Sequence, residues 1–536
     1  MTHKRSVLVY SFILFSITAL IFRVYYISQD TFISTSVNSS NSFLLSVDKT
    51  RGMIYDRNNT PLVYTDSSYT VAVSPSIKSK TYLHSVLDEQ KFKEIEEKFS
   101  KSTPFIFKSD KFIAESDDVK IFLTSQRYSL NSICKHFIGY CDQSLSKGLS
   151  GIEKAYNETL KKCSGELLLR YKTDALGRTL SGVEPQTVNK NYKSEGGVVL
   201  TIDSKIQKIV ENASLLLNGN GSVLVTDTKT GEILAGVSLP QFEREKISNS
   251  INSNDSSLLN RNLSAYNIGS TYKIVVSAAA LIKDINTSFS HTCTGNIKIG
   301  DTVFNCHKLE GHGYCNMKTA FANSCNPYFI RLGLSIGKVR LLSLTSLMGV
   351  GKSIKICDNI VCSSGSIPSV DSINYDTELA NISFGQGSLM ATPLHISQIV
   401  SAAANGGYLV TPTLVKATID NNGNKVDYKN EKTARVMPQN VAETIKDFMI
   451  YTVTSGTGRT AKPQNLLAGG KTASAETGWY SNGEAMVQAW FSGFYPAENP
   501  QYTIVVLCEG GNSGALSCAP VFKNICDKLY EAGFVK

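Results

Sequence analysis

The sequence has no run of five or six basic residues, although its formal net charge at pH 7 is +9. The positive charges are spread along the chain, as on a solvated surface, so nucleic-acid binding is not predicted. Charged residues make up 18% and hydrophobic residues 42% of the 536 residues, which excludes a disordered chain. A chain of this length predicts two to four folded domains.

The N-terminus lacks a small-x-small cleavage site after its one long uncharged run, SVLVYSFILFSITALIF (residues 6–22). Seventeen residues are close to the minimum needed to cross a hydrocarbon core about 30 Å thick, and Tyr25 and Tyr26 extend the run towards the headgroups. We therefore predict an uncleaved single-pass anchor rather than a signal peptide. Lys4 and Arg5 predict a cytoplasmic N-terminus, with the remaining chain on the outer face of the cell membrane.

The order of strand-like and helix-like patterns predicts a mixed α/β fold. The segment RGMIYDRNN (51–59) resembles a hairpin, and the charged pattern from about 83 to 130 predicts helix. After a β-rich run at 198, Asp203 is a candidate helix N-cap. Strand pairs near 221–239 and at the C-terminus, with helices between, predict one domain whose antiparallel sheet joins both ends. The predicted parts are 1–27 (cytoplasmic N-terminus and anchor), 28–195 (non-catalytic) and 196–536 (catalytic).

Ser270 and Lys273 begin the apolar run in YNIGSTYKIVVSAAALI, which predicts a buried helix. A spacing of three places both side chains on one face of the first helical turn. The helix dipole and free backbone N–H groups favour developing negative charge there. The spacing alone is weak evidence, because Ser144 and Lys147 match it too.

Two further motifs follow in order: Ser324-Cys-Asn326 in FANSCNPYF and Lys471-Thr472-Ala473 in LAGGKTASAETG. The ordered set is much stronger evidence of a serine-based active site than any single motif.

A serine hydroxyl becomes a good nucleophile only when a nearby base accepts its proton. No histidine accompanies the three motifs outside the segment 291–312, so Lys273 is the candidate base. Its ordinary pKa is about 10.4. Burial and a second cation such as Lys471 would lower the pKa of Lys273 and leave part of it neutral.

This ordered set resembles the signature of the penicillin-recognising serine transpeptidases, and more narrowly a class B penicillin-binding protein. The resemblance implies a penicillin-binding, serine β-lactamase-like transpeptidase domain, with an antiparallel sheet between helices, at 196–536. It also implies an elongated, β-containing pedestal (dimerisation-like) domain at 28–195. The other segments that match the family in order are RGMIYDRNN, GLSGIEKAYNETL, LTIDSKIQ, DTKTGEILA, SFGQGSLMATPLHIS and TSGTGRTA.

The resemblance further implies a peptidoglycan D,D-transpeptidase that cross-links stem peptides ending in D-Ala-D-Ala and is acylated by β-lactams. An acyl-enzyme forms, D-Ala leaves, and an amine of a neighbouring stem peptide accepts the acyl group. The implied roles are nucleophile for Ser270, base for Lys273, proton relay to the leaving amine for Ser324, and a contact to the peptide amide for Asn326. Lys471 and Thr472 would bind the terminal carboxylate, and the N–H groups of Ser270 and Ser474 would form the oxyanion hole beside Ala473.

Two departures from the family pattern concern its Lys-Thr-Gly motif. A literal Lys-Thr-Gly at 229–231 lies before the nucleophile, inside a predicted hairpin turn, and is not expected to be catalytic. Ala473 stands where the family has glycine. We expect its methyl group to change β-lactam affinity rather than the class of reaction.

The region before residue 196 matches the non-catalytic pedestal, so no glycosyltransferase domain is predicted. Glycan polymerisation would then come from a polytopic membrane glycosyltransferase, in company with other cell-wall synthesis proteins. Three alternatives remain open. A serine β-lactamase would turn over penicillin rapidly, a D,D-carboxypeptidase would release D-Ala to water, and a non-enzymatic scaffold or β-lactam sensor would not need Ser270.

The segment CTGNIKIGDTVFNCHKLEGHGYC (293–315) holds three of the twelve cysteines and two of the seven histidines. Three thiolates and one imidazole suit tetrahedral Zn²⁺, which we predict as a structural ion. A disulfide or an unlinked loop are the alternatives. His307 is disfavoured as a ligand because it adjoins Cys306. The predicted ligands are Cys293, Cys306, His312 and Cys315, with Asp301 as an alternative oxygen ligand to Cys293.

Cysteines outside a cell can also form disulfides in an oxidising environment. Sequence alone does not fix the connectivity. The candidate pairs are Cys134/Cys141, Cys357/Cys362 and Cys508/Cys518.

Overall fold

The structure, a computed structural model, forms two compact units. Two segments that the sequence placed in the non-catalytic part, Arg51–Thr65 and Tyr128–Cys163, belong to the second unit. The domain boundary at 195/196 remains a prediction. The first unit comprises Met1–Thr50, Asp66–Arg127 and Ser164–Ser194, and the second comprises Arg51–Thr65, Tyr128–Cys163 and Glu195–Lys536. The residues described are 2–29, 42–101, 103–129, 131–174, 178–180, 183–244, 247–252, 255–285, 287–428, 434–481 and 484–536.

Helix α1 (Thr2–Gln29) contains the apolar run. Its segment Val7–Tyr26 has a mean hydropathy of 2.2, and its side chains are exposed. Within the described residues it is the one helix whose length and composition would allow it to cross a membrane. The predicted anchor therefore has a suitable helix, and its orientation remains a prediction.

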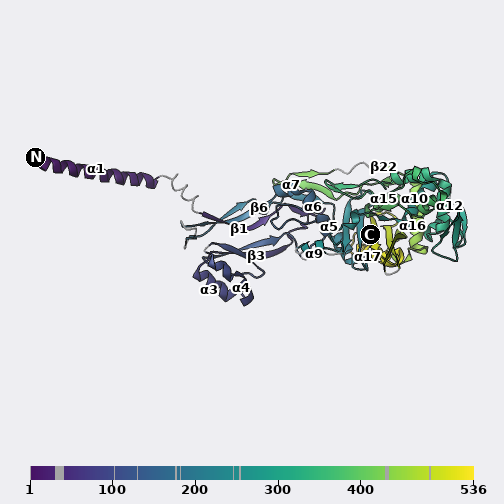
Figure 1. The fold of residues 1–536 in the computed structure, drawn as a ribbon, viewed down its shortest axis with the longest axis horizontal. Coiled ribbons are helices and arrows are strands. Elements are labelled where there is room, and N and C mark those ends of the chain that lie inside the picture. Colours follow the sequence, from purple (N-terminus) through teal and green to yellow (C-terminus); the bar gives the residue numbers. More distant parts are fainter. Residues whose placement is uncertain are drawn as a thin grey trace. The chain divides into compact units, whose positions relative to one another are not determined.

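The first unit holds two three-stranded antiparallel sheets, β1-β6-β7 and β4-β3-β5. Strand β3 alternates between two cores: Val71 and Val73 pack with helices α3 and α4, whereas Ala72 packs with residues of β1 and β6. Figure 1 shows α3 and α4 beside β3. The predicted helix over 83–130 is wrong beyond residue 100, because β4 and β5 extend that sheet. The elements are β1 (Ser42–Thr50), β3 (Asp66–Val73), α3 (Ile77–Val86), α4 (Glu89–Glu96), η1 (Glu97–Ser100), β4 (Phe105–Ser109), β5 (Val119–Gln126), β6 (Gly165–Lys172) and β7 (Gln186–Lys190).

The second unit is built on a five-stranded antiparallel sheet in the order β10-β9-β25-β24-β23. It joins β9 (Gly221–Asp227) and β10 (Ile233–Leu239) to the C-terminal strands β23 (Gly469–Ser481), β24 (Glu484–Tyr495) and β25 (Tyr502–Glu509), as predicted. Both of its faces are buried, because alternate residues of β25 enter two different cores.

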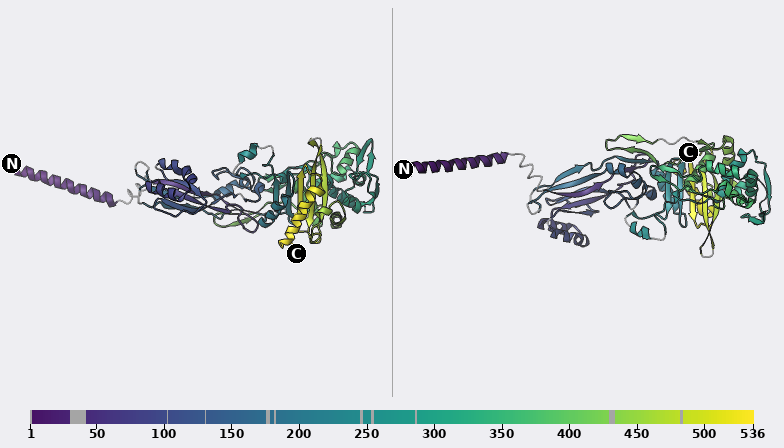
Figure 2. Two further views of the ribbon diagram at one scale, coloured as in Figure 1. Left: turned by 90° about the horizontal axis from the view of Figure 1, so that it is seen from below. Right: turned by 45° about the horizontal axis from the view of Figure 1, so that its top comes forward.

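Helices cover both faces of this sheet. On one face, α8 (Ser204–Ser214) and α17 (Ala519–Glu531) pack together; Figure 2 shows α17 against the yellow strands. On the other face lie α10 (Lys273–Ile282), α15 (Pro393–Ala404) and α16 (Gln439–Ser455). Asp203 caps α8, as expected, and its carboxylate accepts from the amides of Lys205 and Ile206 at 3.0 and 3.2 Å.

The RGMIYDRNN segment forms one strand, β2 (Met53–Tyr55), rather than the predicted hairpin, since only a single bridge pairs Tyr55 with Pro61. Strand β2 joins a sheet of order β2-β8-β20-β21. Arg51 is buried, and its Nε donates to Glu153 Oε2 at 2.9 Å.

The remaining elements of the second unit complete the surroundings of the sheet. They are α5 (Lys135–Ile138), α6 (Gly151–Ala155), α7 (Asn157–Lys162), β8 (Gly197–Leu200), α9 (Ile247–Asn252), η3 (Arg261–Leu263), β11 (Tyr266–Asn267), η4 (Gly269–Tyr272), β12 (Ser290–Cys293), β13 (Asn296–Ile299), β14 (Thr302–Asn305), β15 (Gly313–Asn316), α11 (Met317–Ala322), α12 (Asn326–Ile336), α13 (Lys338–Leu347), β16 (Lys355–Cys357), β17 (Ile360–Val361), η5 (Val370–Ser372), α14 (Asp376–Ser383), β18 (Met390–Ala391), β19 (Tyr408–Leu409), β20 (Val415–Ile419), β21 (Lys425–Asp427), β22 (Ala434–Arg435), η6 (Arg459–Ala461) and η7 (Gly514–Cys518).

Candidate active site

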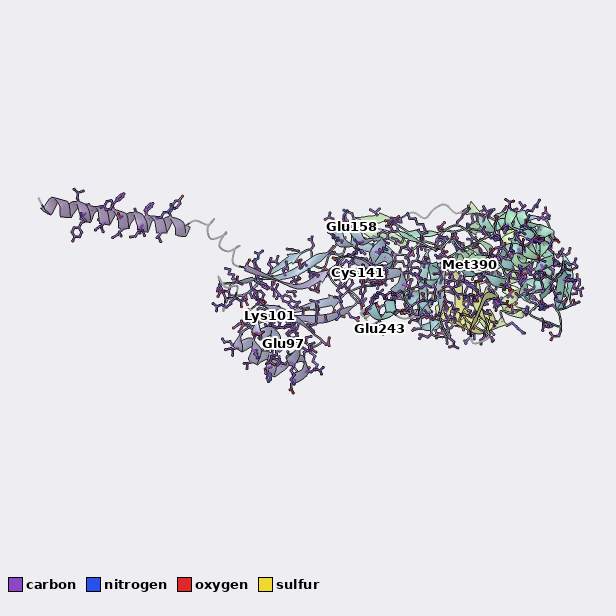
Figure 3. The ribbon with its side chains drawn as sticks, in the orientation of Figure 1. Glu97, Lys101, Cys141, Glu158, Glu243 and Met390 are labelled. Carbon is purple, nitrogen blue, oxygen red and sulfur yellow. The ribbon has the colours of Figure 1, made fainter. Side chains whose placement is uncertain are left out.

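Ser270 lies in the short helical turn η4, and Lys273 is the first residue of α10, as the sequence predicts. Just before Ser270, Gly269 has a φ of 59°, a left-handed conformation that glycine adopts without strain. An added Cβ on Gly269 would also lie 3.0 Å from the Cβ of Ala475 on β23. Strand β11 precedes this turn and pairs with β18, which contains the labelled Met390 (Figure 3). Ser270 is thus held where helix α10 begins beside β23.

Lys273 connects the first motif to the second. Its side chain is fully buried, and its Nζ donates to the carbonyl oxygen of Ser324 at 2.8 Å and to Ser324 Oγ at 3.2 Å. The same Nζ donates to Asn326 Oδ1 at 2.7 Å. The structure therefore brings these two predicted motifs together.

Ser324 occupies the corner between α11 and α12. Its φ is 54°, which is uncommon for a residue with a Cβ and stores strain of about 1–3 kcal/mol. From the third motif, Lys471 Nζ donates to Ser324 Oγ at 3.0 Å. One hydroxyl thus lies within hydrogen-bonding distance of both buried lysines, which links all three motifs.

Burial changes the ionisation of both lysines. Desolvation lowers the pKa of Lys273 to about 7. Desolvation, with the charge of Lys273 nearby, also lowers the pKa of Lys471. A large fraction of Lys273 is therefore neutral near pH 7, and its role as the base for Ser270 remains a prediction.

The third motif lies on β23, the edge strand of the large sheet. Thr472 and Ala473 are almost fully buried, and Ala473 is paired with Trp490 of β24. The structure therefore places the predicted methyl group in the cleft wall. The cleft has a volume of about 300 Å³ and is lined by Ser270, His307, Ser324, Asn326, Thr457, Thr472, Ala473, Ser474 and Ser513–Ala515.

The literal Lys-Thr-Gly at 229–231 forms the turn between β9 and β10. Asp227 Oδ1 accepts from the backbone amides of Lys229 and Thr230 at 2.9 and 2.8 Å. Gly231 completes the turn with a φ of 77°. This segment does not line the cleft, and its lack of a catalytic role remains a prediction.

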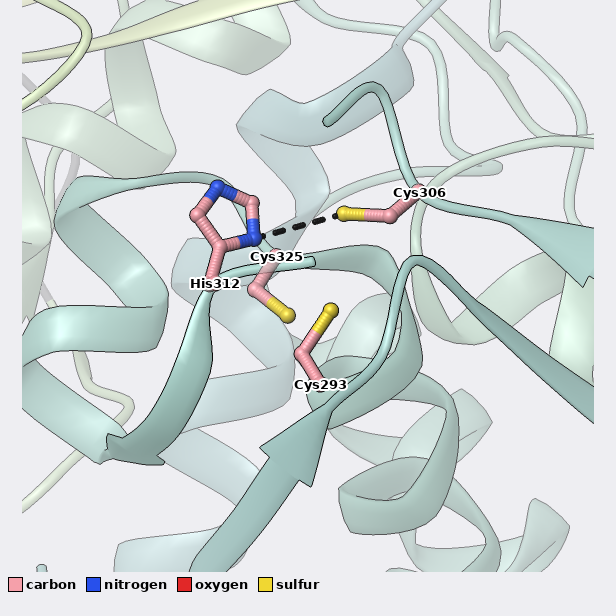
Figure 4. Close-up of side chains that lie close together, drawn as sticks. All are labelled: Cys293, Cys306, His312 and Cys325. Atoms are coloured by element: carbon pink, nitrogen blue, oxygen red, sulfur yellow. Dashed lines mark hydrogen bonds between the residues drawn. The ribbon is translucent and has the colours of Figure 1, made fainter. Parts of the chain in front are cut away.

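Three predicted metal ligands, Cys293, Cys306 and His312, do come together, but the fourth member of the group is Cys325 (Figure 4). Their ligand atoms all lie within 4.8 Å of one another. The predicted ligand Cys315 is not in this group, and its thiol donates to the carbonyl oxygen of Gly313 at 3.6 Å. Cys325 replaces it because the α11–α12 corner turns the middle residue of the Ser-x-Asn motif towards the cluster.

The alternative ligand Asp301 is exposed in the turn between β13 and β14 and is not a member of the cluster either. Within the cluster, His312 Nδ1 lies 3.4 Å from Cys306 Sγ. A hydrogen bond from the thiol of Cys325 lowers the pKa of Cys306 and raises the pKa of Cys325. Cys306 is thus favoured as a thiolate, the form that binds metals.

None of the three candidate disulfides is formed in the described structure, because Cys134, Cys357, Cys362, Cys508 and Cys518 are thiols. Most of these side chains are buried. They are packed as small apolar groups in the cores of the second unit.

Two family models cover most of the chain. The penicillin-binding protein transpeptidase domain matches residues 221–527, and the penicillin-binding protein dimerisation domain matches residues 46–193. Stage V sporulation protein D of Bacillus subtilis is 31% identical over 91% of this chain and 79% of its own length. The chain belongs to the penicillin-binding protein transpeptidase family.

Other relatives agree with this family. The peptidoglycan D,D-transpeptidase MrdA of Acinetobacter baumannii is 26% identical over 92% of this penicillin-binding protein and 82% of its own length. The D,D-transpeptidase domain of an Eggerthella lenta peptidoglycan glycosyltransferase has a similar crystal structure, with a TM-score of 0.66 at 24% identity over 91% of this chain and 99% of that one. The structure of penicillin-binding protein 2 of Helicobacter pylori, solved in complex with MreC, has a TM-score of 0.64 at 22% identity, over 92% of this chain and 99% of that one. The predicted fold class and the enzyme class, a serine-type transpeptidase, are confirmed.

Several cleft residues of this penicillin-binding protein were not predicted to contribute to the site. His307 was considered only as a metal ligand, yet it lines the cleft. Thr457 lies in the segment TSGTGRTA, to which no role was assigned. Ser513–Ala515 follow β25 and carry no sequence signal that distinguishes them from an ordinary loop.

Proposed function

We propose that this protein cross-links peptidoglycan by D,D-transpeptidation through an acyl-enzyme on Ser270. The observation that carries this is Ser324 Oγ, within 3.2 Å of Lys273 Nζ and 3.0 Å of Lys471 Nζ, in the cleft that Ser270 lines. Such a site can move a proton from the nucleophile to a leaving amine without a histidine.

In the first half-reaction, Ser270 Oγ attacks the carbonyl carbon of the penultimate D-Ala while neutral Lys273 takes its proton. The amide C–N bond then breaks, and Ser324 passes a proton to the departing amine of the terminal D-Ala. In the second half-reaction, an amine of another stem peptide attacks the ester carbon, and Ser270 recovers its proton as the ester bond breaks. β-Lactams would acylate the same oxygen when their ring C–N bond opens.

The other motif residues would orient the substrate. Asn326 would contact the peptide amide, and Lys471 and Thr472 would bind the terminal carboxylate. The backbone N–H groups of Ser270 and Ser474 would stabilise the oxyanion. Both residues line the cleft beside Ala473, which supports this assignment.

The product formed in the presence of an amine tests the reaction class. We expect a D-Ala-D-Ala-terminated peptide and a glycine acceptor to give free D-Ala and the peptide–glycine adduct, detected by mass spectrometry. Release of D-Ala with only hydrolysed peptide would indicate a carboxypeptidase. Rapid penicillin turnover would indicate a β-lactamase, and both results would contradict the proposal.

The long apolar helix α1 and the basic residues Lys4 and Arg5 support a membrane anchor with a cytoplasmic N-terminus and a catalytic unit on the outer face. We also propose a polytopic membrane glycosyltransferase and other cell-wall synthesis proteins as partners. The complex of the similar Helicobacter pylori protein with MreC supports the proposal that other cell-wall synthesis proteins are partners.

A structural zinc ion is proposed at Cys293, Cys306, His312 and Cys325. Four ligands at Zn–S distances of about 2.3 Å and tetrahedral angles require sulfur atoms about 3.8 Å apart. The observed limit of 4.8 Å is close to this spacing. Three thiols and one imidazole are also a ligand set typical of structural zinc. The ion would hold the loop that contains Cys306 against the Ser-x-Asn corner.

Metal analysis of two variants tests the ligand set. Protein purified under reducing, chelator-free conditions should contain about one equivalent of zinc, and Cys325→Ser should lose most of it together with thermal stability. Cys315→Ser is the matched control, because Cys315 is equally buried but lies outside the cluster, and it should keep its zinc. Less than about 0.2 equivalents in the unmodified protein would contradict the proposal.

A further inference from the structure

Thr457 lies in the cleft, although it belongs to none of the three catalytic motifs. Its hydroxyl oxygen is 2.7 Å from the hydroxyl oxygen of Thr472 on β23. The same hydroxyl is 3.2 Å from the carbonyl oxygen of Ala322, the last residue of α11. One side chain therefore contacts both the third motif and the helix end that leads to Ser324.

The backbone fixes the position of Thr457. Its amide donates to the Ala322 carbonyl at 3.0 Å, and the amides of Gly456 and Gly458 donate to Thr452 of α16 at 3.0 and 3.1 Å. A Cβ on Gly456 would lie 2.4 Å from the Ala322 oxygen, so only glycine allows this close approach. The loop is thus held by its own backbone, and it sets the hydroxyl of Thr457 beside that of Thr472 before any ligand binds.

Each of the two hydroxyls has one proton, so their hydrogen bond can run in either direction. If Thr472 donates to Thr457, its proton is used and it cannot donate to a ligand. If Thr457 donates to Thr472, the proton of Thr472 is available to the cleft. The competing bond from Thr457 to Ala322 is 3.2 Å, longer than usual for O–H···O, so little is lost when it breaks.

We propose that Thr457 is a positioning residue for carboxylate recognition. Its hydroxyl donates to Thr472, and Thr472 donates to the terminal carboxylate of the peptide or the β-lactam. A hydrogen bond to an ionised acceptor is stronger than a neutral one, and a chain of hydroxyls polarises each of its bonds. This inference rests on the proposed transpeptidase function, because it assumes that a carboxylate-terminated substrate occupies the cleft.

The test compares two substrates that differ only at this group: a peptide ending in D-Ala-D-Ala and the same peptide with a C-terminal carboxamide. We expect Thr457→Val to lower kcat/KM for the carboxylate substrate about tenfold, mostly because KM rises. The same variant should change kcat/KM for the carboxamide substrate by less than about twofold. Thr457→Ser keeps a hydroxyl and should recover most of the loss.

Thr454→Val provides the matched control, because among the described residues the hydroxyl of Thr454 bonds to the carbonyl groups of Ile450 and Tyr451 in its own helix. The Thr454→Val variant should have the same kcat/KM as the unmodified protein for both substrates. An equal loss for the two substrates in Thr457→Val would show a structural role and overturn the inference. Full retention of the preference for the carboxylate would overturn it too. If the unmodified protein forms no acyl-enzyme with either substrate, the proposed function itself fails.

Discussion

Ser270→Ala should abolish covalent labelling by a fluorescent penicillin. The expected loss is at least about 1000-fold, because the proposed acyl-enzyme forms on the hydroxyl oxygen of Ser270, which the variant lacks. Intact-protein mass spectrometry should show one penicillin adduct on the unmodified protein and none on the variant. Digestion should place the adduct on the peptide that contains Ser270.

The chain offers a matched control for this result. Ser144 and Lys147 have the same Ser-x-x-Lys spacing, but the hydroxyl of Ser144 is exposed and donates to Asp142 at 2.7 Å. The Ser144→Ala variant should be labelled by the fluorescent penicillin at the same rate as the unmodified protein. An adduct that persists in Ser270→Ala, or a loss of labelling in Ser144→Ala, would contradict the assignment of the nucleophile.

Lys273→Arg should lower the acylation rate constant by about 100-fold or more, because a guanidinium does not lose its proton near neutral pH. The unmodified protein should show the matching pH dependence. Burial lowers the pKa of Lys273 to about 7, so the neutral base is lost as pH falls below this value. Acylation should therefore rise with pH, be half-maximal near pH 7, and be about tenfold below its plateau at pH 6.

Stopped-flow labelling with penicillin from pH 5.5 to 9 measures both effects. Lys147→Arg is the control, since Lys147 belongs to the exposed Ser144 motif, and its profile should match that of the unmodified protein. A Lys273→Arg variant that acylates at the normal rate would show that another group acts as the base. An unmodified protein whose rate stays flat between pH 6 and 8 would contradict the lowered pKa.

Much of the catalytic unit could be predicted because its signals are local. The spacing of Ser270 and Lys273, the cap at Asp203 and the turn at 229–231 depend on a few neighbouring residues, and the structure has all three. The terminal strand pairs were also recognisable, since their turns lie between apolar runs. Local patterns failed for residues 101–126, because β4 and β5 are short and most of the charged residues that resembled a helical surface lie in the connection between them, residues 110–118.

The full ligand set of the metal cluster could not be predicted from local sequence patterns. Cys315 is near the other ligands in sequence, but its thiol is turned to the carbonyl of Gly313. Cys325 lies 32 positions after Cys293, and it reaches the cluster only because Ser324 adopts a left-handed φ at the α11–α12 corner. No spacing rule in the sequence contains that backbone conformation.

The sequence by itself determined the three motifs, the family that they resemble, the apolar N-terminal segment and the fold class of the catalytic part. These follow from residue type and spacing along the chain. Only the tertiary structure decided that Ser324 Oγ lies between two buried lysines, that Cys325 completes the cluster, and that Thr457 contacts Thr472. Each of these contacts joins residues from separate elements, and their distances depend on how helices and strands pack, which residue spacing does not encode.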